Sequence, residues 1–417
     1  MNLSYALKNR RNLLHLLKNI SDCHVISNGR IYLVGGAVRD LIMEKDRIYD
    51  LDLLITSGHP FEYAKCLKKT ISVDRIIEER KYNTVKLIAE FNGEIFSIDI
   101  NHTRIENYAN PGSLPEIEWV DSLFYDIKRR DFSINTIAMS MNNDSFGEIL
   151  NYSNGIDDLI GMTIRSLHEK SFLEDPTRLI RLVRYKERLG LNIEKRTKSL
   201  FYKAVSENYL KYVSKDRIFN ELLKCLSEDY SHRYFESFNC LGLFNEYKFD
   251  TADLERYEKC PDKKAIEVSN SSDKILLKIL LLKSPLFLMF NMPANYKNRL
   301  EKHIENSSCW KEAILSSKSD SELYKISSSI PDESLAAIAF SSYTENDLWI
   351  SINHYLSTLK ESKTHLTGKD LISMGIKPGK RIRMLLDELL RCRMDGVISD
   401  NREEEIKYIE TKLGRNV

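Results

Sequence analysis

The sequence predicts a two-part protein, in which a small domain that mixes strands and helices precedes a long helical region. Between about residues 31 and 165, short runs rich in Ile, Leu, Val and Phe have the length of strands, namely 31–34, 51–55, 84–91 and 94–100. Helical segments are expected near 60–70 and 133–141. After about residue 168 apolar residues recur at spacings of three and four, and Gly and Pro become sparse. The predicted fold class is therefore α+β at the N-terminal end and all-α thereafter.

Length, composition and charge narrow the possible functions. A chain of 417 residues fits about two to four domains. Its formal net charge is +1, so contacts with nucleic acid would have to come from local basic patches. The seven cysteines form no CxxC pair and no Cys/His cluster. Their spacing argues against a disulfide framework and a structural zinc, and it predicts a reducing, cytoplasmic setting.

No segment has the pattern of a membrane span or a signal peptide. The most apolar stretch, 275–290, is interrupted by Lys278, Lys283 and Pro285, so we expect a core helix and its end. Residues 1–20 place leucines at helical spacing and basic residues on the other face. Because they lack a continuous apolar core and a small-residue cleavage site, we expect a surface helix.

A pair of aspartates in "YDLDLLI", at 49–55, is the first candidate site. In a strand, Asp50 and Asp52 project from the same side while Leu51 and Leu53 enter the core. Paired carboxylates suit Mg²⁺, and two such ions can clamp the oxygens of a phosphoryl transfer. The same pattern alone also fits a polar strand edge.

A double glycine precedes these aspartates in "LVGGAVRDLI", at 33–42. Gly35 and Gly36 follow an apolar strand and precede an expected helix, so backbone amides and Arg39 can approach a phosphate. The pattern is neither a dinucleotide fingerprint nor a Walker loop, because the third glycine and the Lys-Ser/Thr pair are absent. The other interpretation is a plain turn.

Two arginine-rich segments follow. "RRDFSIN" at 129–135 offers an arginine fork for a triphosphate, although a charged helix start has the same residues.

In "EDPTRLIRLVR" charged residues recur every three positions, each step falling about 60° short of a full turn. An Asp accepts hydrogen bonds and an Arg donates them, so an adjacent pair suits cytosine and adenine but leaves unpaired groups facing guanine or uracil. The alternative is an N-cap before proline and a solvated helix face.

Together these segments resemble the class II tRNA nucleotidyltransferase and poly(A) polymerase family of the DNA polymerase β superfamily. The similar motifs, over about the first half of the chain, are "GGAVRD", "DLD", "RRDFSIN", "NGIDDLIGMTIRSL", "EDPTRLIRLVR" and "RIFNELL". The resemblance implies a polymerase β-like nucleotidyltransferase head at 1–165, a helical neck that recognises the nucleotide at 166–230, a helical body at 231–345 and a tRNA-binding helical tail at 346–417. One departure is Asn151, where the family usually has Asp.

The resemblance also implies roles for single residues. It places the metals on Asp50 and Asp52, which would be the catalytic residues. It places the nucleotide against Gly35, Gly36, Arg39, Arg130, Asp131, Asp175, Arg178, Arg181 and Arg184. Asp99 and Asp131 are alternatives for a further carboxylate near the metals. In the tail it implies RNA contacts by Lys369, Lys377, Lys380, Arg381 and Arg383, which would make binding salt-dependent.

The implied function is Mg²⁺-dependent transfer of CMP and/or AMP from CTP and ATP to the 3′ end of tRNA, with release of pyrophosphate. The sequence leaves open whether the product is CCA, CC or A alone, and it leaves the oligomeric state open. The alternatives are a poly(A) polymerase, an RNA-binding protein with a decayed site, and a transferase that acts on a small molecule.

Overall fold

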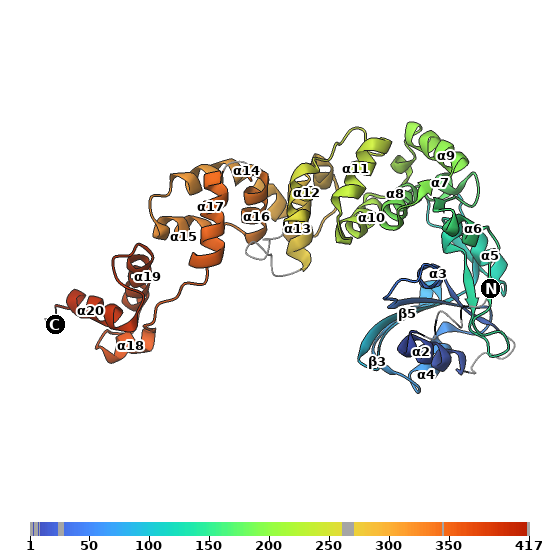
Figure 1. The fold of residues 1–417 in the computed structure, drawn as a ribbon, viewed down its shortest axis with the longest axis horizontal. Coiled ribbons are helices and arrows are strands. Elements are labelled where there is room, and N and C mark those ends of the chain that lie inside the picture. The colour runs from blue at the N-terminus through green and yellow to red at the C-terminus, as the bar shows by residue number, and fades with distance from the viewer. Residues whose placement is uncertain are drawn as a thin grey trace. The chain divides into compact units, whose positions relative to one another are not determined.

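The computed structural model describes residues 3, 7, 9–23, 29–260, 271–343 and 346–414. The chain forms two compact units, one of residues 1–221 with 241–243 and one of residues 222–240 with 244–417. Strands lie in the first unit, and the elements from α8 onward are chiefly helices (Figure 1). The expected α+β and all-α parts are confirmed. The expected head and most of the expected neck fall in one unit, and the four-domain division stays a prediction.

A mixed seven-stranded sheet with the order β3-β4-β5-β2-β1-β8-β9 forms the head. Its strands are β1 (Ile31–Val34), β2 (Asp50–Ile55), β3 (Ser72–Glu79), β4 (Thr84–Phe91), β5 (Glu94–His102), β8 (Ala138–Ser140) and β9 (Ile149–Leu150). Strand β2 pairs in parallel with β5 and antiparallel with β1, so Asp52 lies between Val34 and Asp99. The two carboxylate positions of β2 are therefore central in the sheet.

Helices pack on this sheet along their apolar sides. The helices of the head are α2 (Arg11–Ser21), α3 (Gly36–Ile42), α4 (Pro60–Leu67), α5 (Leu123–Lys128) and α6 (Gly155–Ile160), with a 3₁₀ turn η1 (Arg80–Tyr82). Leu123 and Ile127 of α5 pack with Val34 and Leu54, so α5 lies on the sheet face from which Asp52 projects. The part of the expected N-terminal helix that lies within the described residues is α2, in which Leu13, Leu16 and Leu17 are buried. Most of residues 1–8 lies outside the described residues.

One disulfide, Cys23–Cys66, links the segment after α2 to α4. The Tyr63 hydroxyl, also on α4, donates a hydrogen bond to the carbonyl oxygen of Ile20. Two cysteines 43 residues apart give no spacing signal, so the sequence did not predict this bridge. The bridge removes one argument for the reducing setting that the cysteine spacing suggested.

The helix expected at 133–141 is wrong. The segment forms a 3₁₀ turn, η2 (Ser133–Asn135), and then strand β8, which pairs with β1. Ile134, Ile137 and Met141 have helical spacing, but neighbouring residues in this segment are buried too. A strand that is covered on both faces has a continuous apolar run, and such a run resembles a buried helix. Arg129 and Arg130 accordingly follow α5 and do not begin a helix.

Residues 104–119 form a hairpin with strands at both ends, β6 (Arg104–Asn107) and β7 (Glu116–Trp119). After it, the neck contains α7 (Ser171–Glu174), α8 (Thr177–Leu189), α9 (Lys195–Ser206), η3 (Tyr209–Tyr212) and α10 (Lys215–Ser227), with the short strands β10 (Thr163–Ile164) and β11 (Asn192–Ile193). Helix α8 ends at Gly190, whose φ of 68° is the left-handed conformation typical of a helix C-terminus.

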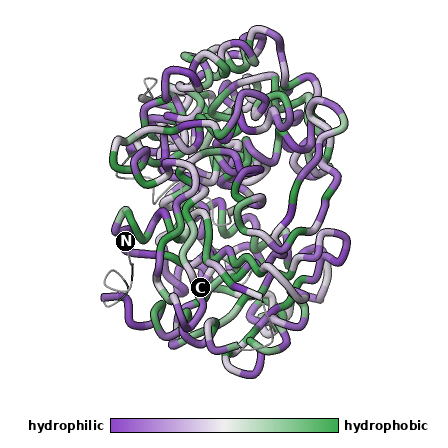
Figure 2. Tube along the Cα trace, turned by 90° about the vertical axis from the view of Figure 1, so that its right-hand side faces the viewer, coloured by the Kyte–Doolittle hydropathy of each residue, from purple (hydrophilic) through white to green (hydrophobic). Residues whose placement is uncertain are grey.

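Helices make up the second unit. Its described α-helices are α11 (His232–Leu241), α12 (Ala252–Lys259), α13 (Ser271–Leu281), α14 (Ala294–Ser316), α15 (Asp320–Ser327), α16 (Asp332–Ser341), α17 (Asn346–His354), α18 (Gly368–Ser373), α19 (Lys380–Met394) and α20 (Arg402–Lys412). A short 3₁₀ helix, η5 (Pro285–Met289), and a short π-helix, η6 (Tyr355–Leu359), lie between them. Hydrophilic and hydrophobic residues alternate along the chain (Figure 2). Among the described residues no helix has the length and apolarity that a bilayer crossing requires.

We predict that Gly155→Ala destabilises the head. A Cβ at Gly155 would clash with the Ser133 carbonyl oxygen and lie 2.8 Å from Cγ1 of Ile137, so α6 would have to move away from η2, at a cost of about 1–3 kcal/mol. Gly368 is the matched control, because it is also the first residue of a short helix and its nearest contact would be an ordinary 3.4 Å. Urea unfolding measures both variants, and equal stability of wild type and Gly155→Ala would contradict the prediction.

Candidate active site

A cleft of about 260 Å³ in the first unit brings together most of the predicted site residues. Its walls come from the loop before α3, strand β2, the β6–β7 hairpin, the segment after α5, and helices α7 and α8. The residues that line it are Gly35, Gly36, Asp52, Glu106, Tyr108, Arg129, Arg130, Asp131, Asn135, Asp175, Arg178, Arg181 and Tyr185. Residues far apart in the sequence therefore share one polar cavity.

Asp52 of β2 is one of the carboxylates that line the cleft. Burial raises the pKa of its carboxyl, and the Asp99 and Asp50 carboxylates raise the pKa further, although Arg130 lowers it. Arg130 and Lys86 thus offset this group of three carboxylates only in part, and a divalent cation would supply further positive charge. Gly35 lies next to it with φ 68°, where a Cβ would be 3.4 Å from Nη1 of Arg130 and 3.6 Å from Oδ2 of Asp52. These are ordinary contact distances, so a glycine is favoured there for its backbone conformation.

Asp50 and Asp99 differ from Asp52 in their surroundings. Asp50 lies at the exposed start of β2 and does not line the cleft. Asp99 is the direct register partner of Asp52 on β5, and Lys86 on β4 donates to its Oδ2 at 3.0 Å.

Among the described residues, no group of three or more His, Cys, Asp or Glu side chains has the arrangement of a metal site. Mg²⁺ commonly uses one or two carboxylates together with substrate phosphates, so the β2 pair fits such an ion.

Two arginines of the segment after α5 are fixed by buried carboxylates. Arg129 donates to Asp126 at 2.7 Å and to Glu106 at 2.8 Å, and Arg130 donates to Asp126 at 3.1 Å. Burial would raise the pKa of Asp126, but Arg129 and Arg130 together hold it below its usual value. The carboxylates therefore stay ionised and hold both guanidinium groups in fixed positions at the cleft wall.

Asp131 connects the head to α8. Its Oδ2 accepts from Nη2 of Arg181 at 2.6 Å and from Nε at 2.9 Å, and its Oδ1 accepts from the Asn135 amide at 3.0 Å. Burial alone would raise the pKa of Asp131, but Arg181 and the amide of Asn135 lower it to about 2. Both carboxylate oxygens are thus committed to protein partners.

Asp175 and Arg178 lie at the junction of α7 and α8. Oδ1 of Asp175 accepts from the Thr177 hydroxyl at 2.6 Å, the Thr177 backbone N–H at 3.1 Å and Arg217 at 2.8 Å. Within the described part of the chain, Oδ2 of Asp175 accepts no hydrogen bond. Arg178 is 4% exposed and donates to the Ser171 hydroxyl at 2.7 Å and to the Arg129 carbonyl at 2.8 Å. Asp175 therefore caps the start of α8 with one oxygen only.

Arg39 and Arg184 were predicted to contact the nucleotide, yet neither lines the cleft. Arg39 is 2% exposed and donates to Oδ1 of Asn135 at 2.8 Å. Arg184 is buried and forms an ion pair with Glu221 of α10 at 3.5 Å. Both guanidinium groups contact the ring of Tyr185, at 5.6 and 5.3 Å from its centroid. In this arrangement they support the wall of the cleft from behind.

Several cleft residues were missed from the sequence. Asn135 stands in the quoted "RRDFSIN" segment and Tyr185 directly follows "RLVR", so adjacency to the motifs was a usable signal. Glu106 and Tyr108 belong to the β6–β7 hairpin, where no spacing pattern marks them. Only the folding of the hairpin against the head and neck brings them to the cleft.

The predicted tail residues lie in the second unit. Lys369 is on α18, Lys377 is in the turn before α19, and Lys380, Arg381 and Arg383 lie at the start of α19. All five are exposed. The first turn of α19 has no acidic residue, although the positive end of a helix favours anions. Because Lys380, Arg381 and Arg383 lie at this positive end, they do not stabilise α19.

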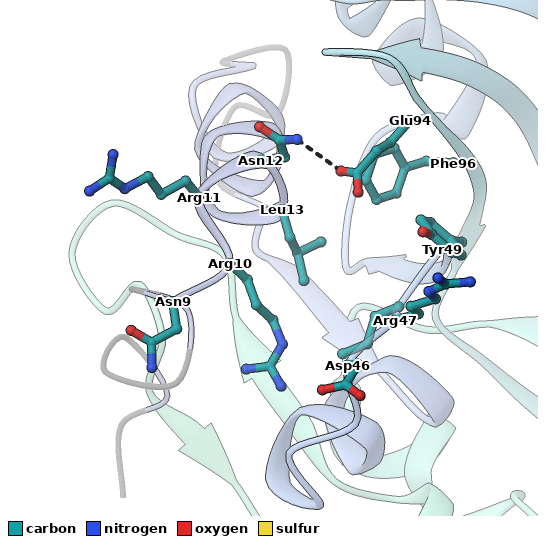
Figure 3. A pocket seen from close by; sticks show the side chains of 11 residues that line it. Asn9, Arg10, Arg11, Asn12, Leu13, Asp46, Arg47, Tyr49, Glu94 and Phe96 are labelled. Atoms are coloured by element: carbon teal, nitrogen blue, oxygen red, sulfur yellow. Dashed lines mark hydrogen bonds between the residues drawn. The ribbon is translucent and has the colours of Figure 1, made fainter.

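A larger cavity, of about 770 Å³, lies elsewhere in the head, between α2, residues 46–49 and β5. Asn12 donates to Glu94 at 3.0 Å there, and Arg11 points away from Tyr49 and Phe96 (Figure 3). None of the predicted site residues lines it. The smaller cleft is therefore the better candidate for the active site.

Comparisons with known proteins agree with this fold. Residues 31–165 match a model described as the poly A polymerase head domain, and residues 190–247 match one described as the probable RNA and SrmB-binding site of polymerase A. A solved structure of a CCA-adding enzyme in its apo form II has a TM-score of 0.74, with 24% identity and 99% of each chain covered. At this identity the structural likeness establishes the fold.

Curated relatives show similar sequences. An A-adding tRNA nucleotidyltransferase from Geobacter sulfurreducens is 29% identical over 90% of this chain, and one from Aquifex aeolicus is 34% identical over 52% of it. The chain spans only 44% and 25% of these two relatives' lengths. A CCA-adding enzyme from Lactobacillus johnsonii is 28% identical, with 91% of this chain and 92% of that protein covered.

We predict that the Asp131–Arg181 ion pair makes the head sensitive to acid. The folded-state pKa of Asp131, about 2, lies below the ordinary carboxyl value, so its stabilisation is complete above about pH 4 and is lost as the pH falls toward 2. The loss is on the order of 2 kcal/mol. Unfolding free energies between pH 6 and 2 should fall more steeply for wild type than for Asp131→Asn, and parallel profiles would contradict this.

Three independent observations agree about the family. The motifs occur in the order of the resemblance, the fold matches that of CCA-adding enzymes, and the head matches the poly A polymerase model. The chain is therefore similar to the class II tRNA nucleotidyltransferases and the poly(A) polymerases in its motifs, in its head domain and in its fold.

Proposed function

We propose that this protein is a template-independent tRNA nucleotidyltransferase that adds CMP and/or AMP from CTP and ATP to the tRNA 3′ end. The observation that supports this most is the shared cleft, where Asp52 and the arginines after α5 face Asp175 and Arg178. Relatives named as A-adding and CCA-adding enzymes support the same class of reaction. A tRNA substrate would place the enzyme in the cytoplasm.

In this proposal Asp50 and Asp52 hold Mg²⁺. The fit rests on the carboxylate oxygens of β2 and on the unbalanced negative charge around Asp52. When bound, Mg²⁺ supplies charge neutralisation at the reacting phosphate oxygens. Asp99 is the better candidate for a further carboxylate, because Asp131 already has Arg181 and Asn135 as partners.

The arginines after α5 would bind and orient the triphosphate. Asp126 keeps Arg130 at the cleft wall, and Glu106 does the same for Arg129. Pre-positioned guanidinium groups lose little freedom when a phosphate binds, and their fork suits phosphate oxygens. Gly35 lets the backbone approach between Arg130 and Asp52. In the reaction the tRNA 3′ oxygen bonds to the α-phosphorus and the bond to pyrophosphate breaks.

Base selection would fall to Asp175 and Arg178. Oδ2 of Asp175 can accept from the exocyclic amino group of cytosine or adenine, while an arginine N–H donates to the adjacent ring nitrogen. Guanine and uracil present the opposite pattern, so they would leave buried groups unpaired. Capping of α8 by Oδ1 is compatible with this role because it orients the carboxylate without using Oδ2.

The decisive experiment supplies defined RNA ends. The protein is incubated with Mg²⁺ and tRNA transcripts that end before the tail, after C and after CC, with CTP and ATP separately and together, and the products are sequenced. We expect addition that stops within CCA. Asp52→Asn should lower the rate at least about a hundredfold, because a metal ligand is lost.

Asp144→Asn is the control for this variant, since Asp144 is an exposed aspartate that pairs with an arginine at the surface. It should retain the wild-type rate. Completion of CCA from every start would identify a full CCA-adding enzyme, and addition of C or A alone would identify half of a divided pathway. Long A tails on arbitrary RNA would instead identify a poly(A) polymerase, and no addition to any RNA would contradict the proposal.

The exposed basic residues around the start of α19 would contact RNA phosphates. We predict that replacing Lys377, Lys380 and Arg381 together by Gln weakens tRNA binding and lowers the slope of log affinity against log salt by about 1 for each lost phosphate contact. Filter binding between 50 and 200 mM salt, roughly the range in which such contacts dominate, measures this. A control variant with Lys68, Lys69 and Lys81 changed to Gln removes equal charge, and an identical slope for both variants would count against the tail contacts.

A further inference from the structure

Two hydrogen bonds at Gly112 attach the tip of the β6–β7 hairpin to the neck. The Gly112 N–H donates to the Leu173 carbonyl at 3.2 Å, and the Gly112 carbonyl accepts from Nη1 of Arg217 at 2.7 Å. Gly112 has φ 67°, and a Cβ there would lie 2.5 Å from the Tyr212 carbonyl oxygen. Only glycine allows this backbone conformation and this close approach.

Arg217 of α10 uses its second terminal nitrogen on the base-selecting carboxylate. Nη2 donates to Oδ1 of Asp175 at 2.8 Å, while Nη1 donates to Gly112. One guanidinium therefore spans the hairpin tip and the start of α8. With two hydrogen bonds from Thr177 on the same oxygen, Asp175 is restricted to one orientation, and its Oδ2 is left for a ligand.

The same hairpin brings an aromatic side chain into the cleft. Tyr108 lines the cleft, and its hydroxyl donates to Oε2 of Glu106 at 2.9 Å. Burial raises the pKa of Tyr108, Glu106 and Asp175 raise it further, and Arg178 lowers it, so the hydroxyl lies within the field of both base-selecting residues. Movement of the hairpin tip would change this wall of the cleft as well as the support of Asp175.

We propose that Arg217 is a positioning residue for base selection, which locks Asp175 toward the incoming base and couples it to the docked hairpin tip at Gly112. This inference rests on the proposed function, because it assigns Asp175 to the base. A lysine could reach only one of the two oxygens, whereas the planar fork of arginine reaches both. Arg217 acts through Asp175 and touches no reacting atom.

Nucleotide discrimination separates this role from simple stabilisation. Arg217→Met, Arg217→Lys and Gly112→Ala are compared by kcat/KM for CTP and ATP against GTP and UTP on the same tRNA. We expect discrimination to fall about tenfold in Arg217→Met and Gly112→Ala, with an intermediate loss in Arg217→Lys, because a mobile carboxylate accepts the wrong bases more often.

Gly93→Ala is the matched control. Gly93 also has positive φ, at 80°, but its Cβ would meet nothing within 4 Å, so this variant has the backbone strain without the displaced hairpin tip. It should keep wild-type discrimination. A slower Arg217→Met enzyme with unchanged discrimination would overturn the inference, as would equal losses of discrimination in Gly93→Ala and Gly112→Ala.

Thermal unfolding tests the attachment without reference to activity. If the contacts of Arg217 and Gly112 act as one attachment of the hairpin tip, the destabilisation by Arg217→Met and by Gly112→Ala is less than additive in the double variant. Additive effects would contradict this single attachment. Failure of the proposed function gives a different pattern, in which wild type adds no nucleotide to any RNA while the coupling between the two variants remains.

Discussion

The ion pair between Asp131 and Arg181 joins the strand-rich head to helix α8, and the cleft depends on it. Asp131 follows α5 and Arg181 lies on α8, so the bond sets how the two walls face each other. Asn135 extends the connection to Arg39 in the head. Because Asp131 is buried, removal of Arg181 would leave its carboxylate without a cationic partner, whereas Arg181 is partly exposed and also pairs with Glu221.

Buried carboxylates determine where the cleft arginines lie. Several guanidinium groups close together would repel one another, and carboxylates offset this repulsion at most of them: Asp126 and Glu106 at the arginines after α5, and Asp131 and Glu221 at Arg181. Arg178 instead donates to the Ser171 hydroxyl and the Arg129 carbonyl. Within the described part of the chain, Asp52 forms no ion pair of this kind, and burial raises the pKa of its carboxyl. Asp52 therefore lies close to the guanidinium group of Arg130, which Asp126 holds in place.

The β6–β7 hairpin links parts of the site that the motifs do not connect. Its base supports Arg129 through Glu106, and its tip reaches Arg217 beside Asp175. The side of the cleft that contains Arg129 and the side that contains Asp175 thus share one structural element. Nothing in the residues of the hairpin indicates this, because its contacts join positions about a hundred residues apart in the chain.

The sequence by itself determined the α+β head, the helical remainder and the short motifs, because strand and helix periodicity and local spacing are properties of neighbouring residues. It placed Asp52, Arg130 and Asp175 in what proved to be one cleft. Only the tertiary structure decided that residues 138–140 form a strand and that Asp131 pairs with Arg181. It also decided that Arg39 binds Asn135 and that Arg184 pairs with Glu221, so that neither lines the cleft. These outcomes depend on which distant group lies opposite each side chain, and a linear pattern does not contain that partner.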